Sequence, residues 1–475
     1  LKPTPWLTER HGYDPTWEKE LRDLQRLYEE DSFQMFVLYG RRRVGKTTLL
    51  NEFCKGKGTI FYSAEQSSRK SNLDKFSQQI FSYYGETNLQ PFLDWEKAFS
   101  YIEEKQEGER LIVVLDEFPY LAQQDPSMIS VLQHLIDHKL CFGRLFLILC
   151  GSYMGFMEKE VLGAESPLFG RRTAQLKLKT FDFFTAKEMM KGFSLEDQML
   201  LYGILGGTPM YLARLNPKRS LQENITDLFL MPTGYLYEEP MLLLRQEVQE
   251  PSVYYSIMEA IASGAVRANE IAQKTGEEAA KCLKYIRVLA ELGMLWKEVP
   301  FGEKYTSRKT MYGIADFMFR FWFRYVSENR TLLETGAQKA VWEKRILPDL
   351  NHYMGLVFEE ICKEYLMREN SEGRLPILFT KLGRWWGSNP VTRQQEEIDL
   401  IAQDGTRYIF AECKWRREKA DYGILIDLQR KADVFCGKRE ETFYFLFSKG
   451  GFTETLKEMA VKDKHLLLIS MEELL

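Results

Sequence analysis

The sequence predicts a multidomain α/β protein whose first domain is a three-layer fold around a largely parallel sheet. Three observations lead to this prediction. A glycine-rich loop at residues 40–47 leaves an apolar run and opens a helical segment. Short apolar strands then alternate with helical segments as far as about residue 180, a pattern typical of a parallel sheet covered by helices. A helical region and a second group of strands after about residue 370 indicate further domains.

The composition describes a globular protein. Hydrophobic residues make up 45% and charged residues 28% of the 475 residues, a length that suits about three or four domains. Apolar runs such as residues 111–115 are too short to cross a bilayer, and no positively charged apolar leader opens the sequence. Seven scattered cysteines fit reduced thiols. We therefore expect a cytoplasmic protein with no membrane partner. The net charge of −4 offers no general attraction to nucleic acid, so any DNA contact must come from a local patch.

The glycine-rich loop has the pattern GxxxxGK[ST] and directly follows the apolar run at residues 36–39. Such a loop points free backbone N–H groups and the positive end of a helix dipole at one spot. Lys46 is expected to reach the β- and γ-phosphates and Thr47 to bind Mg²⁺. A chance glycine-rich loop would not need both a strand before it and a helix after it. We predict an ATP·Mg²⁺ site formed by Gly40, Arg41, Arg42, Arg43, Val44, Gly45, Lys46, Thr47 and Thr48.

A buried strand at residues 111–115 ends in two carboxylates, as expected for the second half of such a site. Asp116 would hold the Mg²⁺ shell and Glu117 would polarise the attacking water. The alternative is that this pair only caps the next helix. Farther along, Arg171 and Arg172 are candidates for a transition-state cation, acting in cis or across a subunit boundary, or else are solvated surface arginines.

The next part of the chain predicts helices and then a winged helix. Residues 251–326 have the order helix, helix, turn, helix and two-stranded wing, which is the winged-helix order. The expected elements are helices at residues 253–262, 268–274 and 277–292 and a hairpin at 295–314 that turns at 301–303. DNA would bind through Lys281, Lys284 and Arg287, unless the module is a spacer or a protein docking surface. Residues 327–340 are polar and aperiodic and are expected to form a linker.

The C-terminal part contains a second candidate site. Asp404-Gly405 is a hairpin signal between two strands, the first carrying Asp399 and the second Glu412 and Lys414, two apart and hence on one face. Two carboxylates beside an ammonium group suit Mg²⁺ or Mn²⁺ and metal-assisted phosphodiester hydrolysis. At least one of these carboxyls should have a raised pKa without metal. The alternative is an ordinary hairpin with exposed charges. The strands are expected near residues 376–380, 397–403, 407–415 and 442–447.

The N-terminal motifs resemble those of the prokaryotic, archaeal-type AAA ATPase family, relatives of the STAND NTPases. The resemblance covers roughly residues 17–325 and rests on residues 39–47, 115–118, 166–173 and 206–212. It implies that Ser152, at the end of the strand 145–150, contacts the γ-phosphate or the lytic water. It also implies that the Gly-Gly-Thr-Pro turn, with Gly207 and Pro209, lies against the nucleotide. Independently of the family, such a turn in a helical region needs a tight bend or a close approach to a ligand.

The C-terminal hairpin resembles the PD-(D/E)xK nuclease core, a restriction-endonuclease-like fold that often ends ATPases of this family. Ile398 replaces the usual proline and leaves the metal ligands intact. The resemblance implies a helix carboxylate, for which Glu359 fits better than Glu360, since Glu360 falls beside Lys363 and Glu364 on the solvated side. A retained fold with a lost activity remains an alternative.

We therefore predict an α/β protein with a P-loop NTPase three-layer parallel sheet, a helical lid, a winged helix and an α/β restriction-endonuclease-like domain. The expected domains are residues 1–180, 181–250, 251–326 and 341–475. The predicted function is an Mg²⁺-dependent ATPase whose nucleotide state controls a nuclease-like domain acting on DNA. The alternative is an ATP-operated switch that binds DNA or a protein partner without cleavage. An oligomer is compatible with either function.

Overall fold

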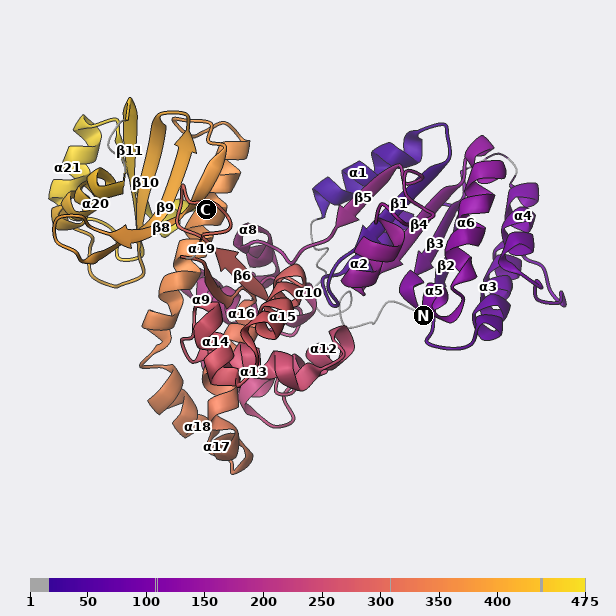
Figure 1. The fold of residues 1–475 in the computed structure, drawn as a ribbon, viewed down its shortest axis with the longest axis horizontal. Helices are drawn as coiled ribbons and strands as arrows, with labels where there is room; N and C mark the ends of the chain where they lie inside the picture. Colours follow the sequence, from indigo (N-terminus) through magenta and orange to yellow (C-terminus); the bar gives the residue numbers. More distant parts are fainter. Residues whose placement is uncertain (1–16, 107, 109, 308, 436–438, 475) are drawn as a thin grey trace. The chain divides into compact units, whose positions relative to one another are not determined.

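The computed structural model describes residues 17–106, 108, 110–307, 309–435 and 439–474. The chain forms two compact units (Figure 1). The first comprises residues 1–180 and 208–214, and the second comprises residues 181–207 and 215–475. Within the described ranges, no helix combines the length and apolar character that a membrane span requires.

The first unit is built on a five-stranded sheet in the order β2-β3-β4-β1-β5, and every paired neighbour is parallel. The predicted parallel sheet is thus confirmed. The strands are β1 (Gln34–Tyr39), β2 (Thr59–Ser63), β3 (Ile112–Asp116), β4 (Phe146–Gly151) and β5 (Ala174–Lys177). The helices are α1 (Glu18–Glu29), α2 (Lys46–Cys54), α3 (Arg69–Tyr84), α4 (Trp95–Lys105), α5 (Phe118–Gln124), α6 (Ser127–His138), α7 (Met154–Phe156) and α10 (Pro209–Leu212).

Alternation along the buried strands creates two apolar faces in this unit. One face of β1, β3 and β4 carries Val37, Val113 and Leu147, which share a core with α3, α4, α5 and α6. Side chains of the opposite face meet α2, where the Phe53 and Phe146 rings lie 5.8 Å apart. Both faces are therefore covered, as expected for a parallel sheet with aliphatic strands.

The second unit begins with helices α8, α9, α11 and α12. Helices α13, α14 and α15 and a two-stranded hairpin follow, in the order that the sequence predicts for residues 251–326. The antiparallel pair β6 and β7 follows α15. Residues 327–340, expected as a linker, instead form short helices, because Leu333 and Val341 are buried. The helices are α8 (Phe183–Ala186), α9 (Leu195–Leu205), α11 (Leu221–Ile225), α12 (Glu239–Glu247), α13 (Pro251–Ala262), α14 (Ala268–Thr275), α15 (Ala279–Glu291), α16 (Phe317–Phe321), α17 (Arg330–Glu334), α18 (Gln338–Val341) and α19 (Leu350–Ser371); the strands are β6 (Leu295–Glu298) and β7 (Met311–Ile314).

The second unit ends in a five-stranded mixed sheet in the order β12-β11-β10-β9-β8. Strands β8, β9 and β10 pair antiparallel, whereas β10, β11 and β12 pair parallel. The strand expected at residues 376–380 is wrong, since the first strand begins at Lys381. The elements are β8 (Lys381–Ser388), β9 (Gln395–Asp404), β10 (Arg407–Lys414), α20 (Tyr422–Phe435), β11 (Glu441–Ser448), α21 (Glu454–Lys462) and β12 (Leu466–Ser470).

Helices cover both faces of this second sheet (Figure 1). Helices α20 and α21 pack on one face through a core that includes Phe410, Leu428 and Leu456. Helix α19 packs on the other, where Tyr365 lies 5.8 Å from Phe447, ring centre to ring centre. Short 3-10 or π turns link or extend helices throughout the chain: η1 (Leu140–Phe142), η2 (Met157–Val161), η3 (Lys187–Met190), η4 (Thr226–Leu230), η5 (Trp322–Val326), η6 (Ser327–Asn329), η7 (Trp342–Ile346) and η8 (Glu472–Leu474).

Candidate functional site

The first candidate site lies at the carboxyl edge of the parallel sheet. The glycine-rich loop follows β1, Asp116 ends β3 and Glu117 follows it, and β4 lies between these two strands. Because parallel strands end at the same edge, groups far apart in sequence meet there. The Thr47 hydroxyl accordingly donates to Asp116 Oδ2 at 3.0 Å.

Both glycines of the loop have backbone conformations and surroundings that exclude a side chain. Gly40 has φ 154°, and a Cβ there would lie 2.3 Å from the Leu178 carbonyl oxygen. Gly45 has φ 94°, and a Cβ would lie 2.4 Å from the Trp17 ring. Glycine is therefore required at both positions for steric as well as conformational reasons.

Lys46 is folded back onto its own loop. Its ammonium group donates to the carbonyl oxygens of Gly40 at 2.8 Å and Arg41 at 2.9 Å. Arg42 donates to the Tyr120 hydroxyl at 2.9 Å. The remaining predicted loop residues are arranged around this turn, with Arg43 in a left-handed conformation, Val44 buried and Thr48 in the first turn of α2.

The carboxylates after β3 have different surroundings. Asp116 is 3% exposed, and burial is the main cause that raises its pKa. Glu117 adopts a left-handed backbone conformation, with φ 50°, which is unusual for a residue other than glycine. Ser152 binds its carboxylate: the Ser152 hydroxyl lies 3.0 and 2.8 Å from the two Glu117 oxygens, and the Ser152 backbone N–H donates at 3.3 Å. Ser152 thus contacts the second carboxylate of the pair, a partner that sequence reasoning did not identify.

The two candidate arginines make local contacts. Arg171 donates twice to Asp137 of α6, each bond 2.7 Å long, and also to the Pro167 carbonyl oxygen. Arg172 lies over the Phe169 ring, 5.9 Å from its centre. The bidentate pair gives Arg171 a structural role in this conformation, and a transition-state role for either arginine stays a prediction.

The Gly-Gly-Thr-Pro turn has a clear backbone role. The Gly207 carbonyl oxygen accepts from the Phe181 N–H at 2.9 Å, and a Cβ at Gly207 would lie only 1.7 Å from the Phe181 oxygen. Thr208 and Pro209 then begin α10. The turn therefore holds the chain against residue 181, while nucleotide contact by Gly207 and Pro209 stays a prediction.

The second candidate site lies on the C-terminal sheet. The β9–β10 register pairs Ala411 with Leu400, so the next pair along brings Asp399 opposite Glu412. The Cys413 N–H donates to Asp399 Oδ2 at 2.8 Å. Lys414 forms an ion pair with Glu412, as expected for residues two apart on one strand face. The three predicted residues are thus together.

A β-bulge interrupts the sheet at this site. Gly383 pairs with Ile401 but Trp385 pairs with Ile398, so that Arg384 alone faces two residues, Asp399 and Leu400. Bulges redirect side chains and are common beside active sites. Glu359, on α19, forms an ion pair with Arg384. The Nε of Arg384 also lies 3.5 Å from Oε1 of Glu397.

The electrostatics confirm the expected carboxyl with a raised pKa. Burial, followed by the nearby Glu412 and Glu359 carboxylates, raises the pKa of Asp399 well above its usual range. Burial alone would lower the pKa of Lys414, but Glu412 outweighs this effect and the pKa is raised. Among the residues described, no three His, Cys, Asp or Glu side chains are placed to hold a metal ion together. Glu359 and Glu412 each form an ion pair with a cationic side chain.

Sequence reasoning missed two cationic residues of this site, Arg384 and Lys431, and misplaced Glu364. Lys431 lies 3.4 Å from both Glu412 oxygens, on helix α20, which was not predicted. Its spacing of four residues from Asp427 was the available signal. The expectation that Glu364 is solvated is wrong, since it accepts from Tyr202 and from the Phe183 N–H.

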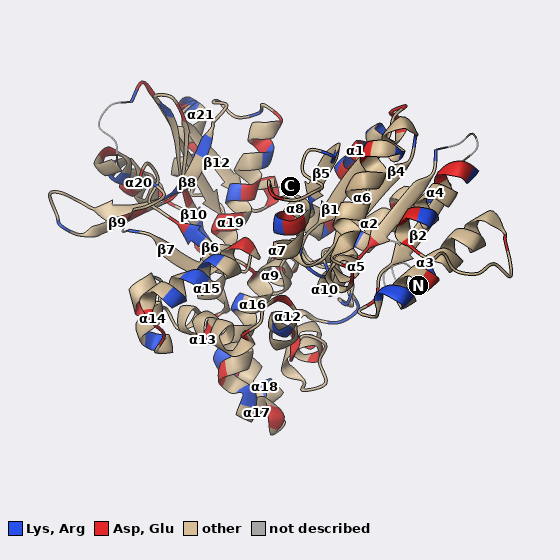
Figure 2. Cartoon of the chain, turned by 45° about the vertical axis from the view of Figure 1, so that its right-hand side comes forward, with Lys and Arg blue, Asp and Glu red and all other residues tan. Residues whose placement is uncertain are grey.

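The predicted DNA-binding helix, α15, contains several Lys and Arg residues (Figure 2). Lys284 and Arg287 of α15 are exposed, whereas Lys281 lies 3.1 Å from Glu277. The loop between β6 and β7 packs on the C-terminal sheet instead: the Phe301 N–H donates to the Arg384 carbonyl oxygen at 2.8 Å, and its ring centre lies 6.0 Å from that of Phe435. That contact covers part of the edge strand β8 next to the bulge.

Comparisons with known proteins agree with the first site. Residues 17–215 match the model of an ATPase domain found predominantly in Archaea, and residues 322–424 match a model of archaeal and bacterial proteins of unknown function.

One relative matches almost the whole chain. The uncharacterized protein MJECL04 of Methanocaldococcus jannaschii is 31% identical over 439 residues, which cover 91% of this chain and 94% of the relative.

Two solved structures are similar in fold to different degrees. The Walker-type ATPase PABY2304 of Pyrococcus abyssi has a TM-score of 0.50 at 21% identity, covering 66% of this chain and 97% of that one. Cdc6p of Pyrobaculum aerophilum has a TM-score of 0.36 at 13% identity, covering 70% and 98%. With its close match to MJECL04 along both chains, this protein belongs to the family of that archaeal protein, and its N-terminal part is an archaeal-type ATPase domain.

Proposed function

We propose that this protein is an Mg²⁺-dependent ATPase whose nucleotide state controls a C-terminal domain that acts on DNA. The observation that carries the proposal is the 3.0 Å hydrogen bond between Thr47 and Asp116. It brings together a hydroxyl from the glycine-rich loop and a carboxylate from the end of β3, 69 residues apart in sequence, which are the two side chains that hold Mg²⁺ in P-loop sites.

The loop lysine is prepared for phosphate. Its ammonium group now donates to two carbonyl oxygens, which are neutral acceptors, and a bound phosphate would offer charged oxygens in their place. Helix α2 begins at Lys46, so the free N–H groups of its first turn and the positive end of its dipole also favour a phosphate. Mg²⁺ held by Thr47 and Asp116 would offset charge on the β- and γ-oxygens, and Glu117 would polarise the attacking water.

Two substitutions separate these roles. Lys46→Ala should weaken ATP binding, because it removes a cation from the β/γ-phosphates, while Glu117→Gln should bind ATP and lose turnover because an amide cannot polarise water. Calorimetry with ATP·Mg²⁺ and a phosphate-release assay measure the two effects. Lys55→Ala, which removes an exposed lysine of the same region, is the matched control. Equal loss of ATP binding in both site variants would contradict the assignment.

For the C-terminal domain we propose metal-dependent cleavage of DNA. Support comes from the order α19, antiparallel β8–β9–β10, α20 and parallel β11, which suits the restriction-endonuclease-like core. Asp399 and Glu412 fit a divalent cation, since they are adjacent oxygen donors on neighbouring strands and Glu412 is only 5% exposed. Glu359 is a third candidate ligand, and Lys414 would aid water activation or offset phosphate charge.

DNA binding is proposed for the exposed side of α15. Lys284 and Arg287 would contact phosphates from a helix that follows a helix and turn, in the manner of a winged helix. The β6–β7 loop is committed to the C-terminal sheet through Phe301, so the helix rather than the wing is the proposed contact.

The rival function is an ATP-operated switch that binds DNA or a protein without cutting. The observation favouring it is that Glu412 already forms ion pairs with both Lys414 and Lys431. A switch would keep these pairs, whereas a nuclease must open them to bind metal.

Mn²⁺ distinguishes the two functions. For a nuclease, Mn²⁺ should raise the melting temperature of the second unit, Asp399→Ala should abolish that rise, and Lys414→Ala should keep it while losing plasmid nicking. A crystal soaked in Mn²⁺ with no ion between Asp399 and Glu412 would leave the switch as the preferred function.

A further inference from the structure

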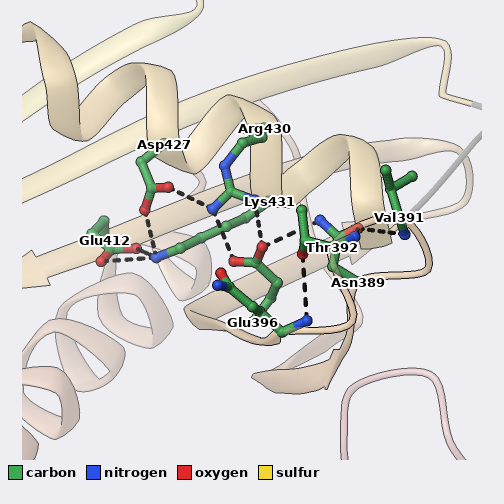
Figure 3. Close-up of polar contacts among 9 residues, drawn as sticks. Asn389, Val391, Thr392, Glu396, Glu412, Asp427, Arg430 and Lys431 are labelled. Atoms are coloured by element: carbon green, nitrogen blue, oxygen red, sulfur yellow. Dashed lines mark hydrogen bonds and ion pairs between the residues drawn. The ribbon is translucent and has the colours of Figure 1, made fainter.

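Helix α20 brings a second lysine to the C-terminal carboxylate cluster. Lys431 lies 3.4 Å from each oxygen of Glu412 and 3.0 Å from Asp427 Oδ2 (Figure 3). Its side chain is 14% exposed and that of Glu412 is 6% exposed. A lysine enclosed to this degree, with its ammonium group directed at a buried carboxylate, is not an ordinary solvated helix residue.

A separate set of contacts fixes the helix that carries Lys431. Arg430 donates to Glu396 of β9 at 2.9 Å and to Asp427 at 2.7 Å. The Asn389 side-chain amide donates to the same Glu396 at 3.3 Å, which ties the network to the turn after β8 (Figure 3). This brace holds α20 against β9 without Lys431. Lys431 can therefore exchange its partner while the helix stays in place.

The charge balance of the cluster changes when a divalent cation binds. The cations Lys414, Lys431, Arg430 and Arg384 stand against the carboxylates of Glu412, Asp427, Glu396, Asp399, Glu359 and Glu397, an excess of two negative charges. A divalent cation on Asp399 and Glu412 would balance this excess. The cation would also take the Glu412 oxygens from both lysines. The two released ammonium groups would then attract an anion, and a phosphodiester oxygen is the anion that DNA supplies.

We propose that Lys431 is a substrate-binding residue of the C-terminal site. It neutralises Glu412 in the metal-free protein and binds a phosphodiester oxygen of the substrate once a divalent cation occupies Asp399 and Glu412. This inference rests on the proposed metal-dependent function of the same site. The ammonium group of Lys431, on α20, would lie on one side of the bound phosphate, and the ammonium group of Lys414, on β10, would lie on the other.

The test measures metal and DNA affinity separately in the full chain without nucleotide. Mn²⁺ affinity is measured by electron paramagnetic resonance, and the C-terminal site is defined as the signal lost in Asp399→Ala. DNA affinity is measured in Mn²⁺ by fluorescence anisotropy with a phosphorothioate duplex that resists cleavage. The variants are Lys431→Met, Lys431→Arg and the control Lys457→Met, an exposed lysine of α21 that pairs with Glu454.

The two affinities should move in opposite directions. Lys431→Met removes a competitor for Glu412, so Mn²⁺ should bind about tenfold more tightly, the scale of one part-buried charge interaction. DNA should bind about tenfold more weakly, and the dependence of log K on log salt should lose about 0.9 in slope, as for one phosphate contact. Lys431→Arg should restore DNA affinity, and Lys457→Met should change neither.

Three other outcomes are distinguishable. If Asp399→Ala binds Mn²⁺ as the parent protein does, the proposed metal site itself fails. If Asp399→Ala loses Mn²⁺ but Lys431→Met keeps parental affinity for both metal and DNA, the site stands and the role of Lys431 is overturned. Weaker Mn²⁺ binding together with a lower melting temperature in Lys431→Met would also overturn it, because Lys431 would then only support the fold.

Discussion

At the scale of single residues, Glu117 is constrained in both its backbone and its side chain. Its left-handed backbone costs about 1–2 kcal/mol for a residue with a Cβ, and the side chain is held by Ser152. Thr47, Asp116 and Glu117 could be predicted because their motifs are contiguous in sequence. The contact with Ser152 could not, since it depends on β4 lying beside β3 and on a backbone angle that no local pattern encodes.

Removing the Ser152 hydroxyl should slow turnover without weakening nucleotide binding. Ser152→Ala deletes both hydroxyl contacts to Glu117 and leaves only the longer bond from its backbone N–H. A carboxylate held by one bond samples other rotamers, so kcat should fall about tenfold, as expected from losing a hydrogen bond to a charged group. Calorimetry should give an unchanged ATP Kd. Ser127→Ala, at the start of α6, is the control, and an unchanged kcat in Ser152→Ala would show that Ser152 does not position Glu117.

Gly207 lies where the backbone leaves no room for a side chain. A methyl group there would overlap the Phe181 carbonyl oxygen, so Gly207→Ala should lower the free energy of unfolding by about 1–3 kcal/mol or more. Gly355 is the matched control, because it lies within α19 and a Cβ added there would meet open space. Gly355→Ala should be neutral or stabilising by up to about 1 kcal/mol. Urea denaturation of both variants measures the difference, and equal midpoints would contradict the steric argument.

At the scale of elements, prediction was most accurate where the pattern was simple. The aliphatic strands β1, β3 and β4 are buried throughout and were found. Strand β8 was misplaced because most of its residues are only half-buried and it contains two glycines, so that neither alternation nor composition marks it. The helices at residues 327–340 were missed because a few buried apolar side chains anchor them among polar residues.

Helix α19 joins two parts of the second unit. Tyr353 of α19 donates to the Gly203 carbonyl oxygen of α9 at 2.6 Å, and Glu364 accepts from Tyr202 at 2.7 Å and from the first N–H of α8 at 2.8 Å. Glu359, five residues before Glu364, forms an ion pair with Arg384 of β8. Helix α19 therefore connects the helical region with the C-terminal sheet through polar contacts.

Glu364 should make the second unit less stable as pH rises. Burial raises its pKa to about 8, with Asp182 and Glu360 adding to the rise. The folded state thus holds a proton that the unfolded state has released above about pH 4–5, so stability falls from there to about pH 8 and then levels off. Glu364→Gln mimics the protonated group and should flatten this decline. Urea midpoints from pH 5 to 9 measure it, with Glu343→Gln, an exposed carboxylate of the same unit, as control. An equal decline in Glu364→Gln would exclude Glu364 as the cause.

At the scale of the whole molecule, the chain crosses between its two units after residues 180, 207 and 214. The predicted boundary at residue 180 coincides with the first crossing. The return of residues 208–214 to the ATPase unit could not be predicted, because nothing in a short helix with Pro209 at its start indicates which core it joins. The hydrogen bond from the Phe181 N–H to the Gly207 carbonyl oxygen joins the residues next to the first two crossings, within the second unit.

The proposed control of the C-terminal domain by nucleotide makes a reciprocal prediction. Segments that cross three times between the units give nucleotide binding a covalent route to the second unit. If ATP changes the affinity for DNA by some factor, DNA must change the affinity for ATP by the same factor, because both describe one coupling free energy.

The variant Glu117→Gln, with Mg²⁺ and a phosphorothioate duplex, allows both affinities to be measured without turnover of either ligand. We expect a coupling of about 1–3 kcal/mol, that is about 5- to 150-fold, in both titrations. Lys46→Ala should abolish the effect of ATP on DNA binding and keep the nucleotide-free DNA affinity. Equal DNA affinity with and without ATP in Glu117→Gln would mean that the ATPase does not control the C-terminal domain through binding, whatever each site does alone.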